Sequence, residues 1–341
     1  MWVYICRVAR MEATGDNVAL SVYVQYNRYE HSRVEGQVRV ARILALANQK
    51  GGVGKTTSTV NLSAYLAARG FRTLLIDIDP QGNATSSLGV DKAACSYAIY
   101  DALLDGTPLP EVIVPSGQER LALVPSTSVL LGSETEAALT SVDQREHRLV
   151  DALRSLPDDA YDLVLIDCPP SLGLLTLNAL VAAEGVIIPI QCEFLALEGL
   201  VQLSNNIQLV KRTFNAQLDI LGVLLTMYDA RTRLSAQVAE EVRRFFPNRL
   251  FASTIPRGIH LAEAPSYGQS ILAYDPASRG ALAYAAAADE TIVRLGLAAP
   301  LLPAPVAAPS SEAGVTTEGG LVSRVASRLA RPFRGGISVA D

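Results

Sequence analysis

The sequence predicts an α/β protein with a doubly wound, mostly parallel sheet. Short, nearly continuous apolar runs alternate along the chain with longer segments whose apolar residues recur at helical spacing. Continuous apolar runs are typical of strands that are buried on both faces of a parallel sheet. Regular alternation of strand and helix places the connecting helices on both faces of that sheet.

The predicted elements follow in order along the chain. Each predicted strand is a short run of mainly branched apolar residues, and the runs are 42–47, 73–77, 121–124, 163–167, 185–190, 220–226 and 250–255. Helical patterns follow most of these runs, among them 56–69, 174–183, 197–213, 234–246 and 279–295. Their alternation with the strands implies an open, doubly wound sheet.

Composition excludes several classes of protein. The chain has 341 residues, 49% of them hydrophobic and 18% charged, so it can bury a large core. The most apolar stretch, 172–190, is interrupted by Asn178 and Glu184, and no run reaches the length of a membrane span, which favours a soluble protein. The four cysteines are far apart and show no disulfide or zinc spacing, which predicts a cytoplasmic protein. A net charge of -5 argues against nucleic acid as a partner unless basic residues are concentrated locally.

The composition also divides the chain into four segments. Residues 1–39 have no clear period, and we interpret them as a loosely ordered extension or a misassigned start. Residues 40–296 carry the alternating pattern and predict one large domain. Residues 297–320 form a linker rich in proline, alanine and small polar residues, and residues 321–341 form a basic tail with a potential amphipathic helix.

A glycine-rich loop lies between the first predicted strand and the first predicted helix. The loop reads Asn-Gln-Lys-Gly-Gly-Val-Gly-Lys-Thr-Thr over residues 48–57, and this placement is the context of a P-loop. Glycines free the backbone N–H groups to wrap phosphates, and the helix N-terminus adds a partial positive charge. The candidate nucleotide-binding residues here are Lys50, Gly51, Gly52, Val53, Gly54, Lys55, Thr56 and Thr57.

Lysine is rare in this chain. Only four of its 29 basic residues are lysines, and two of the four, Lys50 and Lys55, lie in the glycine-rich loop. Lys55 can reach the β and γ phosphates of a nucleotide, and the Thr56 hydroxyl can bind Mg²⁺. In a chain that otherwise uses arginine, both loop lysines indicate a chemical requirement.

Acidic residues close two of the predicted strands. Asp77 and Asp79 follow the run at 73–77, and Asp167 ends the run at 163–167. In a doubly wound sheet, ligands bind at the carboxyl ends of the strands, so these three carboxylates should face the glycine-rich loop. Phosphoryl transfer needs a bound Mg²⁺ ion and a group that orients the attacking water. Carboxylates can hold the ion, directly or through its waters, and can orient the water.

Together these motifs resemble the ParA/Soj family of chromosome and plasmid partitioning ATPases, which are P-loop proteins of the deviant Walker type related to MinD. The resemblance covers about residues 41–296. It implies that ATP and Mg²⁺ are the cofactors, and that Lys50 reaches across a dimer interface to the ATP of the partner while Gly51 lets the subunits approach closely. It further implies the following roles: Lys55 and Thr56 at phosphate and Mg²⁺, Asp79 at the hydrolytic water, Asp77 and Asp167 at Mg²⁺ through water, and Met227 and Pro256 beside the adenine.

The resemblance also implies partners. Family members form ATP-dependent homodimers, bind DNA non-specifically on the nucleoid and are released when a ParB-type centromere-binding protein stimulates hydrolysis. The segment 201–260 carries a net charge of +4 on an otherwise acidic chain. Arg231 matches a DNA-contacting arginine of the family, Arg257 is a second candidate or a solvated charge, and His260 stands where many relatives carry another arginine.

Two other classes share this scaffold. A MinD-like ATPase that binds membranes is the alternative that the basic tail at 321–341 motivates, although the tail is short and contains Pro332. Iron–sulfur carriers and nitrogenase-type reductases need cysteines that bridge a dimer, and Cys168 and Cys192 lack that spacing. Cys168 is expected to be a small buried residue beside Asp167.

Overall fold

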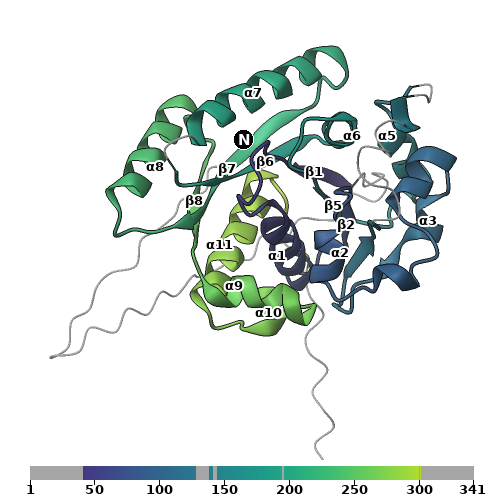
Figure 1. The fold of residues 1–341 in the computed structure, drawn as a ribbon, viewed down its shortest axis with the longest axis horizontal. Coiled ribbons are helices and arrows are strands. Elements are labelled where there is room, and N and C mark those ends of the chain that lie inside the picture. Colours follow the sequence, from purple (N-terminus) through teal and green to yellow (C-terminus); the bar gives the residue numbers. More distant parts are fainter. Residues whose placement is uncertain (1–40, 128–137, 141–143, 194–195, 299, 301–341) are drawn as a thin grey trace, which may run out of the picture. The chain divides into compact units, whose positions relative to one another are not determined.

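An eight-stranded sheet forms the centre of the computed structural model, which describes residues 41–127, 138–140, 144–193, 196–298 and 300 (Figure 1). The strand order is β3-β4-β2-β5-β1-β6-β7-β8, and every neighbouring pair is parallel except β3 with β4. The strands are β1 (Arg42–Leu46), β2 (Thr73–Asp77), β3 (Val114–Pro115), β4 (Leu121–Val124), β5 (Leu163–Asp167), β6 (Gly185–Gln191), β7 (Asp219–Tyr228) and β8 (Leu250–Pro256).

Helices cover both faces of the sheet, as a doubly wound fold requires. The longer helices are α1 (Lys55–Ala68), α6 (Leu174–Ala182), α7 (Ala196–Thr213), α8 (Arg233–Phe245) and α11 (Arg279–Arg294). The shorter ones are α2 (Asn83–Ser87), α3 (Leu109–Val112), α5 (Arg148–Leu153), α9 (Ile259–Glu263) and α10 (Ile271–Tyr274). Single turns of other helix types occur at η1 (Lys92–Ala94), η2 (Asp101–Asp105) and η3 (Ala264–Tyr267).

The core has two main layers because side chains alternate along each strand. From β1, Leu44 and Leu46 pack on the face that α1 and α11 cover, and all three elements contribute to one buried cluster. Ala45 and Ala47 point to the opposite face, where α5, α6, α7 and α8 contribute to a second cluster. Both faces of the central strands are therefore buried, which explains their continuous apolar sequences.

The fold class and all seven predicted strands are confirmed, and the five longer predicted helices form with each end within one residue of the prediction. The pattern missed β3, which has two residues and pairs antiparallel with β4 at the edge of the sheet. It also missed the short helices, because four to six residues are too few to show a period. Residues 1–40 and 301–341, which hold the predicted extension, most of the linker and the tail, lie outside the described residues. Among the described residues, no helix combines the length and apolarity that crossing a bilayer requires.

The topology brings several loops together at the carboxyl ends of the parallel strands. β1 lies between β5 and β6, and α1 and α6, which follow β1 and β5, lie on opposite faces. The strand order therefore reverses beside β1, and this is the position where doubly wound folds bind ligands.

Gly222 provides a test of the packing between β7 and β8. A Cβ at Gly222 would lie 2.4 Å from Cε2 of Phe251 and 2.9 Å from the carbonyl oxygen of Arg249. We expect Gly222→Ala to lower the free energy of unfolding by about 1–3 kcal/mol, because the buried ring and the backbone must both move. Urea denaturation with circular dichroism measures this change.

Gly199→Ala is the matched control. Gly199 lies in α7, and a Cβ there would meet no atom of the described residues within 4 Å. Alanine should therefore stabilise the helix by up to about 1 kcal/mol. Equal effects of the two substitutions would contradict the predicted clash.

Candidate active site

The loop between β1 and α1 has the backbone geometry of an anion-binding site. Gly52 and Gly54 have φ values of 73° and 84°, a left-handed conformation that is favourable for glycine and costly for other residues. Gly54 is the N-cap of α1, and no side chain caps the first turn of this helix. The N–H groups at the start of α1 therefore stay available for a ligand, where the helix dipole also favours negative charge.

The neighbouring strands hold this loop in place. The Asn48 side chain donates from Nδ2 to the carbonyl oxygen of Pro189 in β6 at 2.7 Å, and its Oδ1 accepts from the Lys50 N–H at 3.0 Å. The Thr226 hydroxyl in β7 donates to the carbonyl oxygen of Val53 at 2.8 Å. Sequence reasoning assigned no role to Asn48 or Thr226, because a partner more than a hundred residues away leaves no periodic signal.

The two loop lysines lie in opposite environments. Lys55 is 6% exposed, and its Nζ donates to the carbonyl oxygen of Lys50 at 3.1 Å. Burial lowers the pKa of Lys55, and the nearby Asp167 carboxylate partly offsets this effect. The Lys50 side chain is 45% exposed and forms an ion pair with Glu193, just after β6. Lys55 therefore points into the site, whereas Lys50 lies on the surface.

Asp77 and Asp167 lie side by side at the carboxyl ends of β2 and β5. They are register partners across the two strands, and both are fully buried. Asp167 accepts from the hydroxyls of Thr56 at 2.8 Å and Thr59 at 2.9 Å. Asp77 accepts from the N–H and the hydroxyl of Thr85 at 2.8 and 2.7 Å.

Burial raises the pKa of both carboxyls. At Asp77 the charge of Asp167 raises the pKa further, and the two hydrogen bonds from Thr85 oppose the rise. At Asp167 the bonds from Thr56 and Thr59 lower the pKa, and the charge of Asp79 raises it. Two adjacent buried carboxylates are unfavourable without a cation, because desolvation and repulsion act in the same direction.

The donor set fits Mg²⁺. The Thr56 hydroxyl and the carboxylates of Asp77 and Asp167 are hard oxygen donors gathered beside the loop. The described residues contain no group of three or more His, Cys, Asp or Glu side chains that could hold a metal ion alone. A Mg²⁺ ion that keeps several waters and binds substrate phosphates needs no such group.

Asp79 lies just past β2 in a tight turn. It is 5% exposed, and its Oδ1 accepts from the Gln81 N–H at 3.0 Å. Its N–H donates to Oδ1 of Asp77 at 3.3 Å, and its carbonyl oxygen accepts from the Ser126 hydroxyl at 2.6 Å. The structure thus brings Asp79 together with Asp77, and it adds Ser126, which sequence reasoning missed.

Met227 and Pro256 also lie near the carboxyl ends of their strands, β7 and β8. Met227 follows Thr226, whose hydroxyl holds the loop, and it has a φ of 50°, which is uncommon for a residue with a side chain. Pro256 ends β8 and pairs in register with Tyr228 of β7. The two candidates for the adenine side are therefore neighbours.

The three DNA candidates differ in their surroundings. The Arg231 side chain is 89% exposed and forms two hydrogen bonds with Asp229, at 2.9 and 2.8 Å. These bonds, with a third from the Arg231 N–H, lower the pKa of the partly exposed Asp229 carboxyl to about 2. Arg257 follows β8, and its guanidinium lies 4.0 Å from the sulfur of Met227. His260, in α9, shares a hydrogen bond with Asp275, so an adjacent carboxylate would neutralise a protonated imidazole.

Much of the basic segment at 201–260 is paired within itself. Lys211 and Arg249 contact Asp219, and Arg243 and Arg244 contact Glu240. Exposed pairs of this kind contribute little to stability. A phosphate backbone can therefore compete for these cations.

Cys168 and Cys192 are both buried, at 0% and 8% exposure. Burial raises the pKa of Cys168 far above its usual range, as expected for an inert core cysteine.

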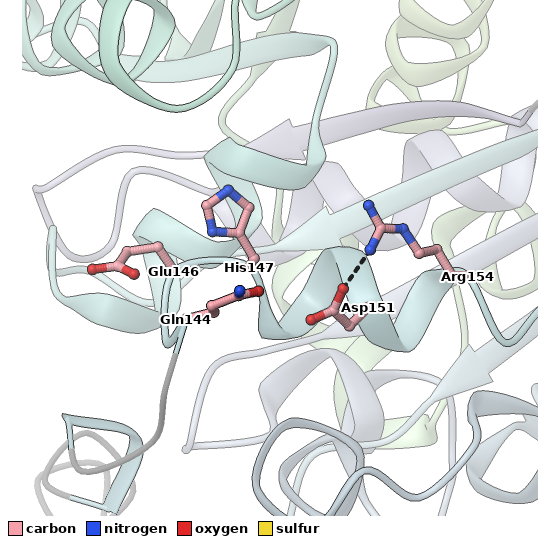
Figure 2. Close-up of a pocket in the computed structure, with 5 residues that line it drawn as sticks. All are labelled: Gln144, Glu146, His147, Asp151 and Arg154. Atoms are coloured by element: carbon pink, nitrogen blue, oxygen red, sulfur yellow. Dashed lines mark hydrogen bonds and ion pairs between the residues drawn. The ribbon is translucent and has the colours of Figure 1, made fainter.

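A shallow hollow of about 400 Å³ lies around α5, and Figure 2 shows its charged lining. Asp151 and Arg154 form an ion pair at 2.7 Å there, beside Glu146 and His147. None of the predicted site residues lines it. We place the active site at the glycine-rich loop, because the candidate chemistry gathers there.

The parallel sheet, the loop at the N-terminus of α1 and the paired carboxylates define a P-loop ATPase of the deviant Walker type. Residues 41–220 match the model of the AAA domain family. The sporulation initiation inhibitor protein Soj of Bacillus subtilis is 51% identical over 251 residues, which are 74% of this chain and 98% of that protein. The chromosome partitioning protein ParA of Myxococcus xanthus is 50% identical over 259 residues, 76% of this chain and 90% of that protein.

A solved structure has a similar fold. Cobyrinic acid a,c-diamide synthase from Mycobacterium smegmatis, with bound ADP and magnesium, is 40% identical and has a TM-score of 0.64, covering 73% of this chain and 93% of that one. The chain belongs to the ParA/Soj family of chromosome-partitioning ATPases.

The paired carboxyls make the stability of the nucleotide-free protein depend on pH. Their pKa values are raised in the fold, so the folded state binds more protons than the unfolded chain between the two sets of pKa values. Lowering the pH from about 8 to about 5 should therefore stabilise the fold, by about 1–3 kcal/mol. Urea denaturation in the presence of EDTA measures the effect.

Asp167→Asn identifies the source of that dependence. The variant removes one carboxyl and the repulsion on Asp77, so its stability should change less with pH than that of the wild type. Asp158→Asn changes an exposed acid and should leave the pH profile unaltered. If the Asp167→Asn profile runs parallel to the wild-type profile, the buried pair is not the cause.

Proposed function

We propose that this ParA-type ATPase forms an ATP-bound sandwich dimer, holds nucleoid DNA non-specifically, and releases it when a ParB-type partner stimulates hydrolysis. The observation that carries the proposal is the pair of loop lysines: Lys55 points into the site, and Lys50 lies exposed on the surface beside it. One lysine can serve the phosphates of its own subunit, and the other can serve those of a second subunit. The relatives named Soj and ParA support the cellular role.

ATP would bind at the glycine-rich loop. The N–H groups from Gly51 to Thr57 and the ammonium of Lys55 would hold its phosphates. Thr56 would contact Mg²⁺ directly, and Asp77 and Asp167 would contact it through water. The ion supplies positive charge at the phosphates. ADP and magnesium in the mycobacterial structure support both cofactors.

Asp79 would orient the attacking water. Its Oδ1 accepts the Gln81 N–H, and the turn contacts hold the side chain beside Asp77. A buried carboxylate in a fixed turn can hold a water in line with a bound phosphate at little further entropic cost. Hydrolysis would then depend on placement more than on covalent chemistry.

The glycine at position 51 is an argument for the proposed dimer. Its φ is not among the positive values, and a Cβ there would meet only Cβ of Pro170 at 4.0 Å. Nothing within the described chain therefore demands glycine at this position. A closely approaching partner backbone would demand it.

Arg231 and Arg257 would contact DNA phosphates, and His260 would add little because its ring nitrogen already shares a hydrogen bond with Asp275. Contacts to phosphates alone do not distinguish one base sequence from another. Such contacts would suit a cytoplasmic protein that binds DNA anywhere on the nucleoid.

Asp79→Ala tests the hydrolytic role. We expect ATP-dependent dimerisation and DNA retention to persist, because ATP binding does not need this carboxylate, and turnover to fall by about 100-fold or more. Phosphate release and gel filtration with ATP measure the two properties. Asp158→Ala, at an exposed turn, should leave both unchanged. A wild-type rate of ATP turnover in Asp79→Ala would contradict the water-positioning role.

Arg231→Ala tests the DNA contact. We expect weaker ATP-dependent DNA retention, a log-log salt slope smaller by about 0.9, and unchanged basal turnover. Arg154→Ala is the matched control, because Arg154 is also exposed and also pairs with a nearby aspartate, Asp151. A salt series with fluorescent duplex DNA measures both variants. The same slope for Arg231→Ala and wild type would exclude a phosphate contact.

A further inference from the structure

The turn that carries Asp79 is bound to the end of β4. The Ser126 hydroxyl donates to the carbonyl oxygen of Asp79 at 2.6 Å, 47 residues away in the chain. The Ser126 N–H donates to the Thr85 hydroxyl at 2.9 Å, and that hydroxyl donates to Asp77 at 2.7 Å. One serine therefore contacts the backbone of Asp79 directly and the carboxylate of Asp77 through a single threonine.

All of this network is withdrawn from solvent. Ser126, Thr85 and Asp77 are fully buried, and Asp79 and Tyr100 are each 5% exposed. Because a carbonyl oxygen can only accept, the single proton of the Ser126 hydroxyl goes to Asp79. Tyr100 can then donate its single hydroxyl proton to the Ser126 hydroxyl at 3.1 Å or to the carbonyl oxygen of Ile78 at 3.5 Å.

The turn also packs closely against the end of β4 and Lys92. Gly82 has a φ of 62°, and a Cβ there would lie 2.6 Å from the Ser126 carbonyl oxygen and 2.8 Å from the Lys92 ammonium nitrogen. That ammonium donates to the carbonyl oxygen of Gln81 at 2.6 Å. The segment from Asp79 to Gly82 therefore contacts both β4 and Lys92.

We propose that Ser126 is a positioning residue for ATP hydrolysis, which fixes the Asp79 turn and, through Thr85, the Asp77 carboxylate in one arrangement. This inference rests on the proposed function, in which Asp79 orients the attacking water. Small misplacements of a water-orienting carboxylate lower the rate steeply while leaving substrate binding intact. Ser126 would thus affect the chemical step without touching ATP.

Ser126→Ala tests the proposal, because it removes the donor and leaves the Asp79 carbonyl oxygen without that partner. We expect kcat to fall by about 10- to 100-fold, with the KM for ATP and the ATP-dependent DNA retention unchanged. Ser126→Cys keeps the shape and a weak donor, so its kcat should lie between those of wild type and Ser126→Ala. Phosphate release at saturating Mg-ATP and DNA measures kcat in the full chain.

Thr73→Val is the matched control for general destabilisation. The Thr73 hydroxyl is fully buried, donates to the carbonyl oxygen of Phe71 at 3.1 Å, and lies at the opposite end of β2. The midpoint temperature of thermal unfolding should fall by similar amounts in Thr73→Val and Ser126→Ala, but kcat should fall only in Ser126→Ala. A comparable loss of kcat in Thr73→Val, or a rise of KM and a loss of DNA retention in Ser126→Ala, would assign Ser126 a merely structural role.

Asp79→Ala, alone and combined with Ser126→Ala, separates this inference from the proposed function. If Ser126 acts through Asp79, the double variant should be no slower than Asp79→Ala. Loss of turnover in Asp79→Ala with wild-type turnover in Ser126→Ala would overturn only the role of Ser126. Full turnover in Asp79→Ala would overturn the water-positioning role, and with it the mechanism inferred for Ser126.

Discussion

The burial of two carboxylates side by side is the constraint on which the site depends. Asp77 and Asp167 end adjacent strands in register, away from water, where each raises the free energy of ionising the other. The surrounding groups relieve this cost in part: threonine hydroxyls donate to both carboxylates, and the Lys55 ammonium lies nearby. A divalent cation beside the two carboxylates would offset the remaining cost.

The parallel topology brings distant sequence segments together at the carboxyl ends of the strands. The glycine-rich loop follows β1, the paired carboxylates end β2 and β5, and Thr226 lies near the end of β7, yet the strand order reverses beside β1 and gathers all of them. Each contact therefore couples two strands as well as two functional groups. Displacing one strand end by a fraction of an ångström would move several parts of the site together, which explains why so many of the supporting groups are buried hydroxyls with fixed partners.

The central strands and the site loop could be predicted from sequence because their signals are local. Continuous apolar runs mark strands buried on both faces, and a glycine-rich loop before a helix marks an anion site. Ser126 and Asn48 escaped prediction, because a serine or an asparagine gives no sign of which remote carbonyl oxygen it will meet. The ion pairs within 201–260 escaped for the same reason: a net charge of +4 does not show that acids neutralise several of its cations.

The scarcity of lysine has a practical consequence for labelling. Of the four lysine side chains, Lys50 and Lys55 lie in the nucleotide loop, Lys92 contacts the turn that follows Asp79, and only Lys211 is remote from them in sequence. An amine-reactive reagent does not modify the abundant arginines, so most of its side-chain targets lie at or beside the glycine-rich loop. Among them Lys50 is exposed, whereas Lys55 is shielded by its burial. A change in Lys50 reactivity, followed by mass spectrometry, would therefore report events at this loop.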